Sequence, residues 1–246
     1  MRLRNSLKEI LPDGALGYIR WIRNAVYDVY ATKSYSQEGE DMILRRIFED
    51  RSEGFYVDVG AHHPKRFSNT YLFYRAGWSG INVDATPGSM AAFRKSRPRD
   101  INVEVAISEE PGEAIFYLYN EPALNSFQKR ADLDMRDGMY RVIGETKVPT
   151  RRLEEVLAEH LGEGQRIDFL SVDAENMDLE VLQSNNWQRF RPGYVLVEYQ
   201  GGSDIEQVDG NETSLFLEKQ GYALFAKTLN TLIFKESDPR PGALER

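Results

Sequence analysis

The stretch FYVDVGAHHPKRFSNT, residues 55–70, runs from apolar residues through a glycine to a group of polar residues. Its first five residues predict a buried strand, and Ser68 predicts the start of the helix that SNTYLFYRAG continues. The next apolar run, GINVD at residues 80–84, predicts a second strand. A strand, a helix and a strand in this order are typical of a parallel sheet.

The same alternation extends along most of the chain. We expect further strands in INVEVAIS, AIFYLYN, IDFLSVD and YVLVEY, and further helices in PGSMAAFRKSR, LEEVLAEHL and MDLEVLQS. A helix at ETSLFLEKQG and a hairpin at YALFAKTLNTLIFKE follow. This order predicts an α/β, Rossmann-like fold with a mainly parallel sheet, helices on both faces, and ligands bound beyond the carboxyl ends of the strands.

One segment does not follow this alternation. Residues 120–146 show no clear period and mix Asn, Asp, Arg and Met. A long excursion in a compact domain is often a binding loop or a lid. We therefore expect this segment to shape the site of the second substrate.

Composition narrows the functional classes. The length of 246 residues suits one large domain, and the net charge of −8 without a long basic run speaks against nucleic-acid binding. The chain has no cysteine, which excludes disulfides and cysteine-based metal sites. No apolar run reaches the roughly 18 residues of a membrane span, and the N-terminus lacks the apolar core of a signal peptide. We expect a cytoplasmic protein.

The chain is expected to have two parts, a helical appendage at residues 1–33 and a domain at residues 34–246. Residues 1–32 carry five basic and three acidic residues, opposite to the charge of the whole chain. The segment GYIRWIRNAVYDVY within it has apolar residues at helical spacing. Such a helix either packs on its own domain or lies on a membrane surface or a partner.

Two acidic residues and one glycine indicate the cofactor. Asp58 and Gly60 end the first core strand, and Asp84 ends the next strand, 24 residues after Gly60. A carboxylate at that distance from a glycine turn suits the hydroxyls of a ribose. The phosphate-binding patterns G-x-G-x-x-G and G-x-x-x-x-G-K-[ST] are absent. An adenosine cofactor without phosphates, S-adenosylmethionine (SAM), is therefore favoured, unless Asp58 only caps a turn and Asp84 is a solvated loop carboxylate.

Several segments resemble the FkbM family of SAM-dependent methyltransferases. They are, in order, YSQEGEDMIL, FYVDVGAHHP, SNTYLFYRAGWSGINVDATP, NVEVAIS, VPTRRLEEVL and IDFLSVDAENMDLEVL, and they cover roughly residues 34–199. The resemblance implies a class I methyltransferase fold, a seven-stranded sheet with an antiparallel last strand. It also implies O-methylation, often of a sugar hydroxyl in polysaccharide or natural-product pathways, with release of S-adenosylhomocysteine (SAH).

The resemblance also implies site residues. Asp58, Gly60 and Ala61 match the SAM turn, Asp84 the ribose-binding acid, and Asp173 and Glu175 the D-x-E segment of the family. This chain departs from the family at His62, where many members have Asn or Asp, at His63-Pro64, and at Asn176. The full expected cofactor set is Asp58, Gly60, Ala61, His62, Asn69, Asp84, Ala85, Val105, Ala106, Ser108 and Gln37. For Gln37 and Asn69, capping of a helix is an equal alternative.

Methyl transfer to a hydroxyl calls for a group that positions the acceptor and takes its proton. Asp173 and Glu175 follow the strand IDFLSVD and are the first candidates, and their alternative role is to cap the next helix. His63 is a further candidate base, and its alternative role is to hydrogen-bond the loop backbone. Asp173, Glu175 and one histidine also suit Mg²⁺ or Mn²⁺, although no ligand spacing is specific enough to assign a metal site.

The leading hypothesis is an O-methyltransferase that acts on a small-molecule or glycan acceptor. The main alternative is a non-catalytic SAM-fold module that works by binding a partner. A nucleotide-dependent oxidoreductase or epimerase is disfavoured because the glycine pattern is missing.

Overall fold

The computed structural model describes residues 17–18, 21–22, 24, 30–129, 139–199, 201, 208 and 210–237. The chain divides into two compact units, Met1–Ser34 and Tyr35–Arg246. In the first unit the described residues 17–18, 21–22 and 24 are helical, and most of the helical appendage expected at residues 1–33 lies outside the described residues. Within the part of the chain that is described, no helix is both long and apolar enough to cross a bilayer.

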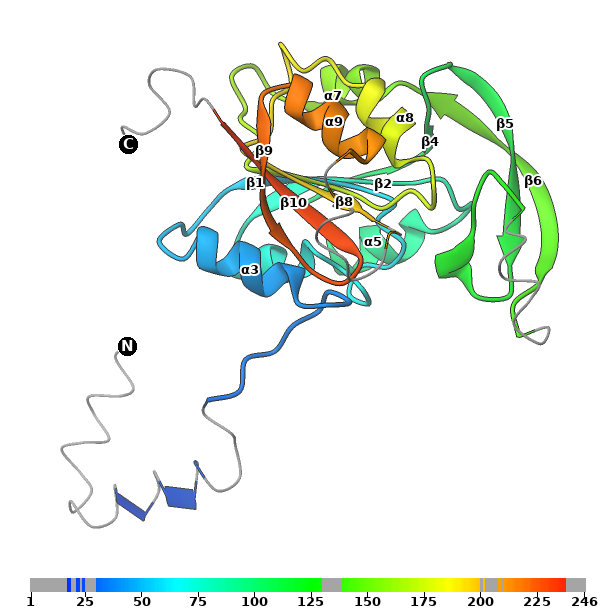
Figure 1. Cartoon of the computed structure of the whole chain (residues 1–246). Helices are drawn as coiled ribbons and strands as arrows, with labels where there is room; N and C mark the ends of the chain where they lie inside the picture. The colour runs from blue at the N-terminus through cyan, green and yellow to red at the C-terminus, as the bar shows by residue number, and fades with distance from the viewer. Residues whose placement is uncertain are drawn as a thin grey trace. The chain divides into compact units, whose positions relative to one another are not determined.

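The second unit is built on a seven-stranded sheet (Figure 1). Its strand order is β3-β2-β1-β7-β8-β10-β9, and every pairing is parallel except those of β10, which runs antiparallel to β8 and β9. This confirms the predicted fold, including the antiparallel last strand. The strands are β1 Phe55–Val59, β2 Ser79–Asp84, β3 Ile101–Glu104, β7 Phe169–Val172, β8 Tyr194–Glu198, β9 Tyr222–Lys227 and β10 Thr231–Glu236.

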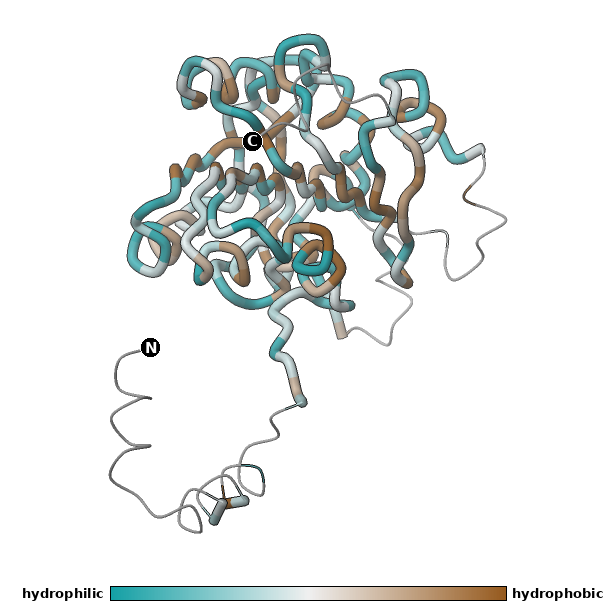
Figure 2. The backbone as a smooth tube through the Cα atoms, turned by 90° about the vertical axis from the view of Figure 1, so that its left-hand side faces the viewer, coloured by the Kyte–Doolittle hydropathy of each residue, from teal (hydrophilic) through white to brown (hydrophobic). Residues whose placement is uncertain are grey.

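Helices cover both faces of this sheet. Figure 1 shows α7, α8 and α9 on one face and α3 and α5 on the other. Figure 2 shows hydrophobic residues running along the strands, with hydrophilic residues in the surrounding turns. The helices are α3 Glu40–Ile47, α4 Tyr71–Ala76, α5 Met90–Ser96, α7 Leu153–His160, α8 Asp178–Gln183 and α9 Glu212–Lys219.

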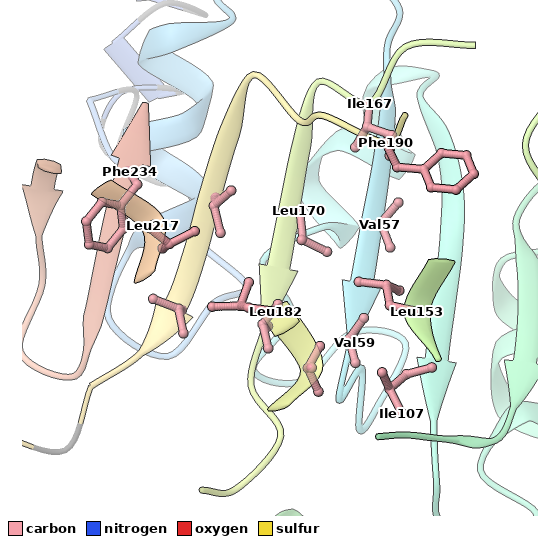
Figure 3. Close-up of a cluster of buried hydrophobic side chains, with 14 of the residues drawn as sticks. Val57, Val59, Ile107, Leu153, Ile167, Leu170, Leu182, Phe190, Leu217 and Phe234 are labelled. Carbon is pink, nitrogen blue, oxygen red and sulfur yellow. The ribbon is translucent and has the colours of Figure 1, made fainter. Parts of the chain in front are cut away.

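Successive residues of each strand fill two separate cores. Val57 and Val59 of β1 pack with Leu153 of α7 and Leu182 of α8 in the larger core (Figure 3). Tyr56, between them in sequence, belongs to the opposite core with residues of α3 and α4. Because side chains alternate across a strand, apolar residues at every position bury the sheet on both faces.

A second, three-stranded sheet departs from the prediction. It has the order β4-β6-β5 and consists of β4 Ala106–Ile107, β5 Gly112–Tyr119 and β6 Val142–Arg151. The expected single strand INVEVAIS is wrong, because the chain leaves the large sheet at Val105 and its second half pairs with β6. In the 120–146 excursion, the short 3-10 helix η1 (Pro122–Leu124) and the start of β6 are described, whereas residues 130–138 lie outside the described residues.

Candidate functional site

The site begins where the strand order reverses, between β1 and β7. From β1 the chain adds β2 and β3 on one side of the sheet and later adds β7 and β8 on the other. The turn after β1 is pinned to β2, because the backbone N–H groups of Gly60 and Ala61 donate to the carbonyl of Val83 at 2.9 and 3.1 Å. In α/β sheets such a reversal leaves a crevice in which ligands bind.

Gly60 is required at this point by both conformation and space. Its φ of +78° lies in the left-handed region that favours glycine. A Cβ on Gly60 would lie 1.7 Å from the carbonyl oxygen of Asp173. The turn after β1 and the end of β7 therefore touch through their backbones.

The first cavity lies above the ends of β1 and β2. The empty space within its lining, open solvent included, is about 530 Å³. Apolar and polar groups share its wall, as expected of an adenosine-sized ligand. Its lining includes Gly60, His62, Asp84, Ala85, Thr86, Val105, Ala106, Phe116, Asn125, Phe127, Asp173 and Glu175.

Asp84 is held rigidly at the wall of this cavity. Its Oδ2 accepts the backbone N–H of His62 at 2.8 Å, and its Oδ1 accepts the backbone N–H of Thr86 at 2.8 Å. A carboxylate oxygen has two acceptor sites, so each oxygen keeps capacity for a ligand hydroxyl. The geometry is that of a carboxylate oriented in advance for a diol.

The far end of the cavity suits a flat, apolar group. Val105 and Ala106 line it from the chain between the two sheets, and Phe116 and Phe127 line it from the β5–η1 side, with ring centroids 5.0 Å apart. Ser108 is not part of this lining, and its hydroxyl accepts the backbone N–H of Glu110. Sequence analysis named neither phenylalanine, although Phe127 lies in the 120–146 segment that was expected to shape the site of the second substrate.

Two expected cofactor residues support the turn from below and do not line this cavity. Ala61 packs against Met90 and Phe93. Asp58 accepts the hydroxyl of Thr70 at 2.7 Å. Burial raises the pKa of Asp58, while the positive charge of Arg97 opposes that rise.

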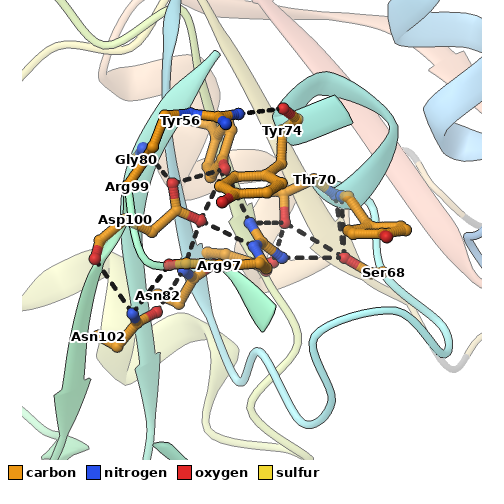
Figure 4. Close-up of polar contacts among 12 residues, drawn as sticks. Tyr56, Ser68, Thr70, Tyr74, Gly80, Asn82, Arg97, Arg99, Asp100 and Asn102 are labelled. Atoms are coloured by element: carbon orange, nitrogen blue, oxygen red, sulfur yellow. Dashed lines mark hydrogen bonds and ion pairs between the residues drawn. The ribbon is translucent and has the colours of Figure 1, made fainter. Parts of the chain in front are cut away.

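Arg97 lies at the centre of a buried polar cluster (Figure 4). Its side chain is fully buried and forms an ion pair with Asp100 at 2.7 Å. It also donates to the hydroxyls of Tyr56 and Thr70, each at 2.9 Å. Thr70 therefore connects the guanidinium group of Arg97 to the carboxylate of Asp58.

A second cavity, of about 470 Å³, lies on the other side of Asp173. Gln37 and Asn69, both expected to bind the cofactor, line it. Asn69 donates to the hydroxyl of Ser171 at 3.0 Å. The remaining lining is mostly polar and consists of Glu38, Glu40, Phe67, Val172, Asp173, Leu196, Glu198, Asn230 and Thr231.

The segment SQEGED holds Gln37 in that wall. Ser36, not Gln37, accepts backbone N–H groups at the start of α3, those of Gly39 and Asp41. Glu38 accepts the backbone N–H of Asn230 and the hydroxyl of Thr228, each at 2.7 Å. The segment is thereby tied to the turn between β9 and β10, and the side chain of Gln37 is left for the cavity.

A third, open cavity of about 1440 Å³ joins the first two. It shares Gly60, His62, Ala123, Asp173 and Glu175 with the first cavity. With the second it shares Gln37, Phe67, Asp173, Glu198 and Asn230. Asp173 lines all three cavities and so lies at their junction. Arg66, Glu121, Leu124 and Tyr140 complete the open cavity, and sequence analysis singled out none of them.

Asp173 has a perturbed carboxyl group. The protein atoms crowded around it and the negative charges of Glu198, Asp178 and Glu175 raise the pKa of Asp173 well above its usual range. Its side chain is nevertheless exposed in the open cavity, so water reaches the carboxyl group until a ligand covers it. A carboxyl group with a raised pKa in a cleft is typical of a functional site.

Glu175 also lines the first and third cavities. Asp178, rather than Glu175, holds the backbone at the start of α8. Asp178 accepts the backbone N–H of Ala174 at 3.0 Å, and burial raises its pKa to about 7. Glu175 and Asn176 both have left-handed backbones, with φ of +49° and +73°. Such conformations cost energy in residues other than glycine, and they are concentrated at functional sites.

The two neighbouring histidines lie differently. His62 lines the first and third cavities, and its buried Nε2 has no hydrogen-bond partner among the described residues. His63 lines none of the three cavities, and its Nδ1 accepts the backbone N–H groups of Lys65 at 3.1 Å and Arg66 at 2.9 Å. The structure therefore shows the loop-holding arrangement of His63.

Within the described residues, no group of three or more histidine, aspartate or glutamate side chains is arranged to hold a metal ion. The combination of Asp173, Glu175 and a histidine considered from the sequence does not form such a group.

The chain was compared with solved structures and with curated proteins. Among solved structures, the chain is similar to the O-methyltransferase from Bacillus cereus in complex with SAH, with 11% identity, 92% of this chain and 91% of that chain covered, and a TM-score of 0.43. It is also similar to the TehB-like SAM-dependent methyltransferase from Corynebacterium glutamicum, with 11% identity, 92% and 100% coverage, and a TM-score of 0.41. The search of curated proteins found no match.

A family comparison covers most of the folded unit. The methyltransferase FkbM domain matches residues 58–224, more than half of the chain. The matched range contains the end of β1, the glycine turn, Asp84 and Asp173. The chain therefore belongs to the FkbM family of methyltransferases, whose methyl donor is S-adenosylmethionine.

Proposed function

We propose that the protein transfers the methyl group of SAM to a hydroxyl oxygen of a sugar or a related acceptor, and that Asp173 takes the hydroxyl proton. One observation carries the proposal: Asp173 lines both the first cavity, which contains Asp84, and the open cavity. A group at that junction is the one that can touch both reactants.

The residues of the first cavity fit the cofactor. Asp84 would hold the ribose hydroxyls, and Val105, Ala106 and Phe116 would enclose the adenine. Gly60 lets the turn after β1 pack directly on the end of β7 at the wall of this cavity. Asn69 and Gln37, in the second cavity, offer amide groups to the amino-acid end. The adenosine part of the cofactor is thus assigned to the first cavity and its amino-acid end to the second, with Asp173 between them.

Methyl transfer to a hydroxyl requires that the acceptor oxygen be positioned at the methyl group and that the hydroxyl proton be removed. Bound SAM supplies a methyl group on a positively charged sulfur, which leaves as the neutral thioether of SAH. The new bond joins the acceptor oxygen to the methyl carbon, and the hydroxyl proton goes to a carboxylate oxygen of Asp173. Because its pKa is raised, Asp173 is a stronger proton acceptor than an ordinary carboxylate, provided that it is ionised.

Glu175 and Glu198 line the open cavity beside Asp173 and are placed to orient the acceptor hydroxyl. His63 is left out of this proposal, because its Nδ1 is occupied by two backbone N–H groups and its ring lines none of the three cavities. The sugar-type acceptor is supported by the resemblance to the FkbM family and by the amide and carboxyl groups of Asn230 and Glu198 in the cavity wall.

The first experiment tests binding and turnover together. We expect SAM and SAH, but not NAD, to raise the thermal unfolding midpoint, and radiolabelled methyl to pass from SAM to members of a panel of methyl glycosides. A lack of stabilisation by either ligand would sink the enzyme proposal. Stabilisation without transfer to any acceptor would favour the alternative, a SAM-fold module that acts through a partner.

The second experiment tests Asp173 itself. Asp173→Asn keeps the size of the side chain but removes the base, and we expect kcat to fall about 10²- to 10⁴-fold while SAH still binds. The matched control is Glu163→Gln, which alters an exposed carboxyl group in the loop before β7. Normal turnover in Asp173→Asn would show that another group accepts the proton.

A further inference from the structure

Phe67 is an aromatic residue in an unusual position. It lies in the loop between β1 and α4, and 43% of its surface is exposed. Its φ is +55°, in the left-handed region that bulky residues rarely adopt. A residue that is both strained and exposed is not explained by packing of the core, and an observed outlier of this kind points to function.

The loop around Phe67 is held so that the ring stays in place. The His63 ring fixes the backbone just before it through the N–H groups of Lys65 and Arg66. Just after it, the backbone N–H of Ser68 donates to the carbonyl of Tyr35 at 3.0 Å. With both neighbours fixed, the strained conformation of Phe67 is imposed by the surrounding structure.

Planar groups also support the ring. The ring of His62 lies at a small angle to it, with centroids 6.4 Å apart, and the guanidinium group of Arg66 lies 4.4 Å from its centroid. Arg66 is in turn paired with Glu121 at 3.1 Å. Phe67 is thus part of a stack that connects the glycine turn to the η1 segment, and its remaining surface lines the second and third cavities.

The company of Phe67 in these cavities suggests what it contacts. Asp173 and Asn230 line the same two cavities and offer hydrogen-bonding groups beside the ring. A pyranose has the matching two-sided chemistry, because its axial C–H groups form an apolar face and its hydroxyls point outward around the ring. An aromatic ring beside amide and carboxyl groups satisfies both parts.

We infer that Phe67 is the platform for the acceptor, and that the apolar face of an acceptor ring packs on it so that one ring hydroxyl reaches Asp173. This inference rests on the proposed methyltransferase function and adds a specificity-determining residue to it. Phe67 takes no part in the transfer of the proton or of the methyl group. It should therefore govern the KM of the acceptor far more than the binding of the cofactor.

The test compares side chains of equal backbone strain. Phe67→Leu removes the ring but keeps a bulky residue at the same φ, and Phe67→Tyr keeps the ring. The acceptor is the methyl pyranoside that the wild type labels best. With it, we expect Phe67→Leu to raise KM about tenfold and Phe67→Tyr to keep a KM close to that of the wild type. The Kd of SAH should change far less than the acceptor KM in both, although Phe67 also borders the second cavity. Phe225→Leu is the matched control, since Phe225 is 48% exposed on β9 and lines none of these cavities.

A second arm replaces the ring of the acceptor. A linear hexitol carries a hydroxyl on every carbon but has no rigid apolar face, so we expect a much higher KM that Phe67→Leu does not raise further. An unchanged KM for the pyranoside in Phe67→Leu would overturn the platform while leaving the methyltransferase intact. If wild-type protein binds SAH but labels no pyranoside, the ring acceptor itself is rejected. If it does not bind SAH, the proposed function fails first.

Discussion

His62 and His63 are adjacent, yet the structure gives them different environments. Nδ1 of His63 accepts two backbone N–H groups, so it must carry no proton. Burial and the positive charges of Arg66 and Lys65 lower the pKa of His63. The ring therefore remains neutral near pH 7 and acts as a fixed acceptor for the loop that carries Phe67.

Substitution of His63 separates the two roles that the sequence allowed. Asparagine can accept backbone N–H groups two and three residues ahead, whereas phenylalanine cannot. We expect His63→Asn to keep most of the activity and His63→Phe to raise the KM of the acceptor, measured by steady-state transfer of labelled methyl. A loss of kcat of two orders of magnitude or more in His63→Asn would instead identify His63 as the base.

The pH dependence of stability follows from the same contact. Because the folded state lowers the pKa of His63, the unfolded chain binds more protons just below its pKa of about 6.5. The contribution of His63 is therefore present above that pH and is lost as the pH falls through the folded pKa. The difference in unfolding midpoint between wild type and His63→Phe should shrink as the pH is lowered from 7 to 5.

Asp173 should set the acidic limb of the pH–rate profile. Only its ionised form accepts a proton, and its pKa is raised by its crowded surroundings and by Glu198, Asp178 and Glu175. We expect kcat/KM to fall with decreasing pH well above the usual carboxyl value of about 4. The apparent pKa belongs to the coupled carboxyl groups together.

Removal of one neighbouring charge checks this assignment. Glu198→Gln takes away a negative charge beside Asp173, so the acidic limb should move to lower pH, whatever happens to kcat. An acidic limb that stays in place in Glu198→Gln would show that a different group controls it.

At the scale of elements, the buried cluster around Arg97 joins parts of the chain that local patterns do not connect. Arg97 follows α5, Asp100 precedes β3, Tyr56 lies on β1, and Thr70 precedes α4. All four meet in one hydrogen-bonded cluster (Figure 4). The sequence offered no indication of this cluster, since a charged residue near the end of a helix is more often exposed.

Arg97→Met should reduce the free energy of unfolding by about 3–5 kcal/mol, because it leaves the carboxyl groups of Asp100 and Asp58 buried without their cation. Chemical denaturation measures this loss. The double variant Arg97→Met with Asp100→Asn removes one of those charges and should recover part of it. Equal stability of the single and double variants would show that the loss comes from packing rather than from unpaired charge.

Element prediction succeeded where apolar residues alternate with turn signals. The strand FYVDV, the helix opened near Ser68 and the strand ending at Asp84 were all expected from the residues that form them. The break of INVEVAIS at Val105 was not, because both halves are equally apolar and only their partners, β2 and β6, differ. A local pattern identifies a strand but not the sheet that it joins.

At the scale of the whole molecule, the candidate site needs parts that are remote in sequence. Glu38 contacts the turn after β9, and Phe116, Asn125 and Phe127 approach the ends of β1 and β2 from the region of the small sheet. Asp58, Gly60, Asp84 and Asp173 could be named from the sequence because they end predicted strands. Phe116, Asn125 and Phe127, which cover the cofactor cavity, could not be named in this way, because their position depends on how the 120–146 excursion folds back.

This assembly predicts which segments are protected from hydrogen exchange when the cofactor product SAH binds. At a concentration 100 times its Kd, SAH should stabilise the protein by about 2.7 kcal/mol, because it binds the folded state alone. Hydrogen exchange should slow in the glycine turn at residues 60–63, after β2 at residues 84–86, and in the η1 segment at residues 122–127. It should not change in α9, which contributes no residue to the first cavity. NAD is the control and should alter none of these segments. Protection of the strand ends without protection of residues 122–127 would mean that the cavity binds its ligand from the large sheet alone and that the small sheet does not close over it.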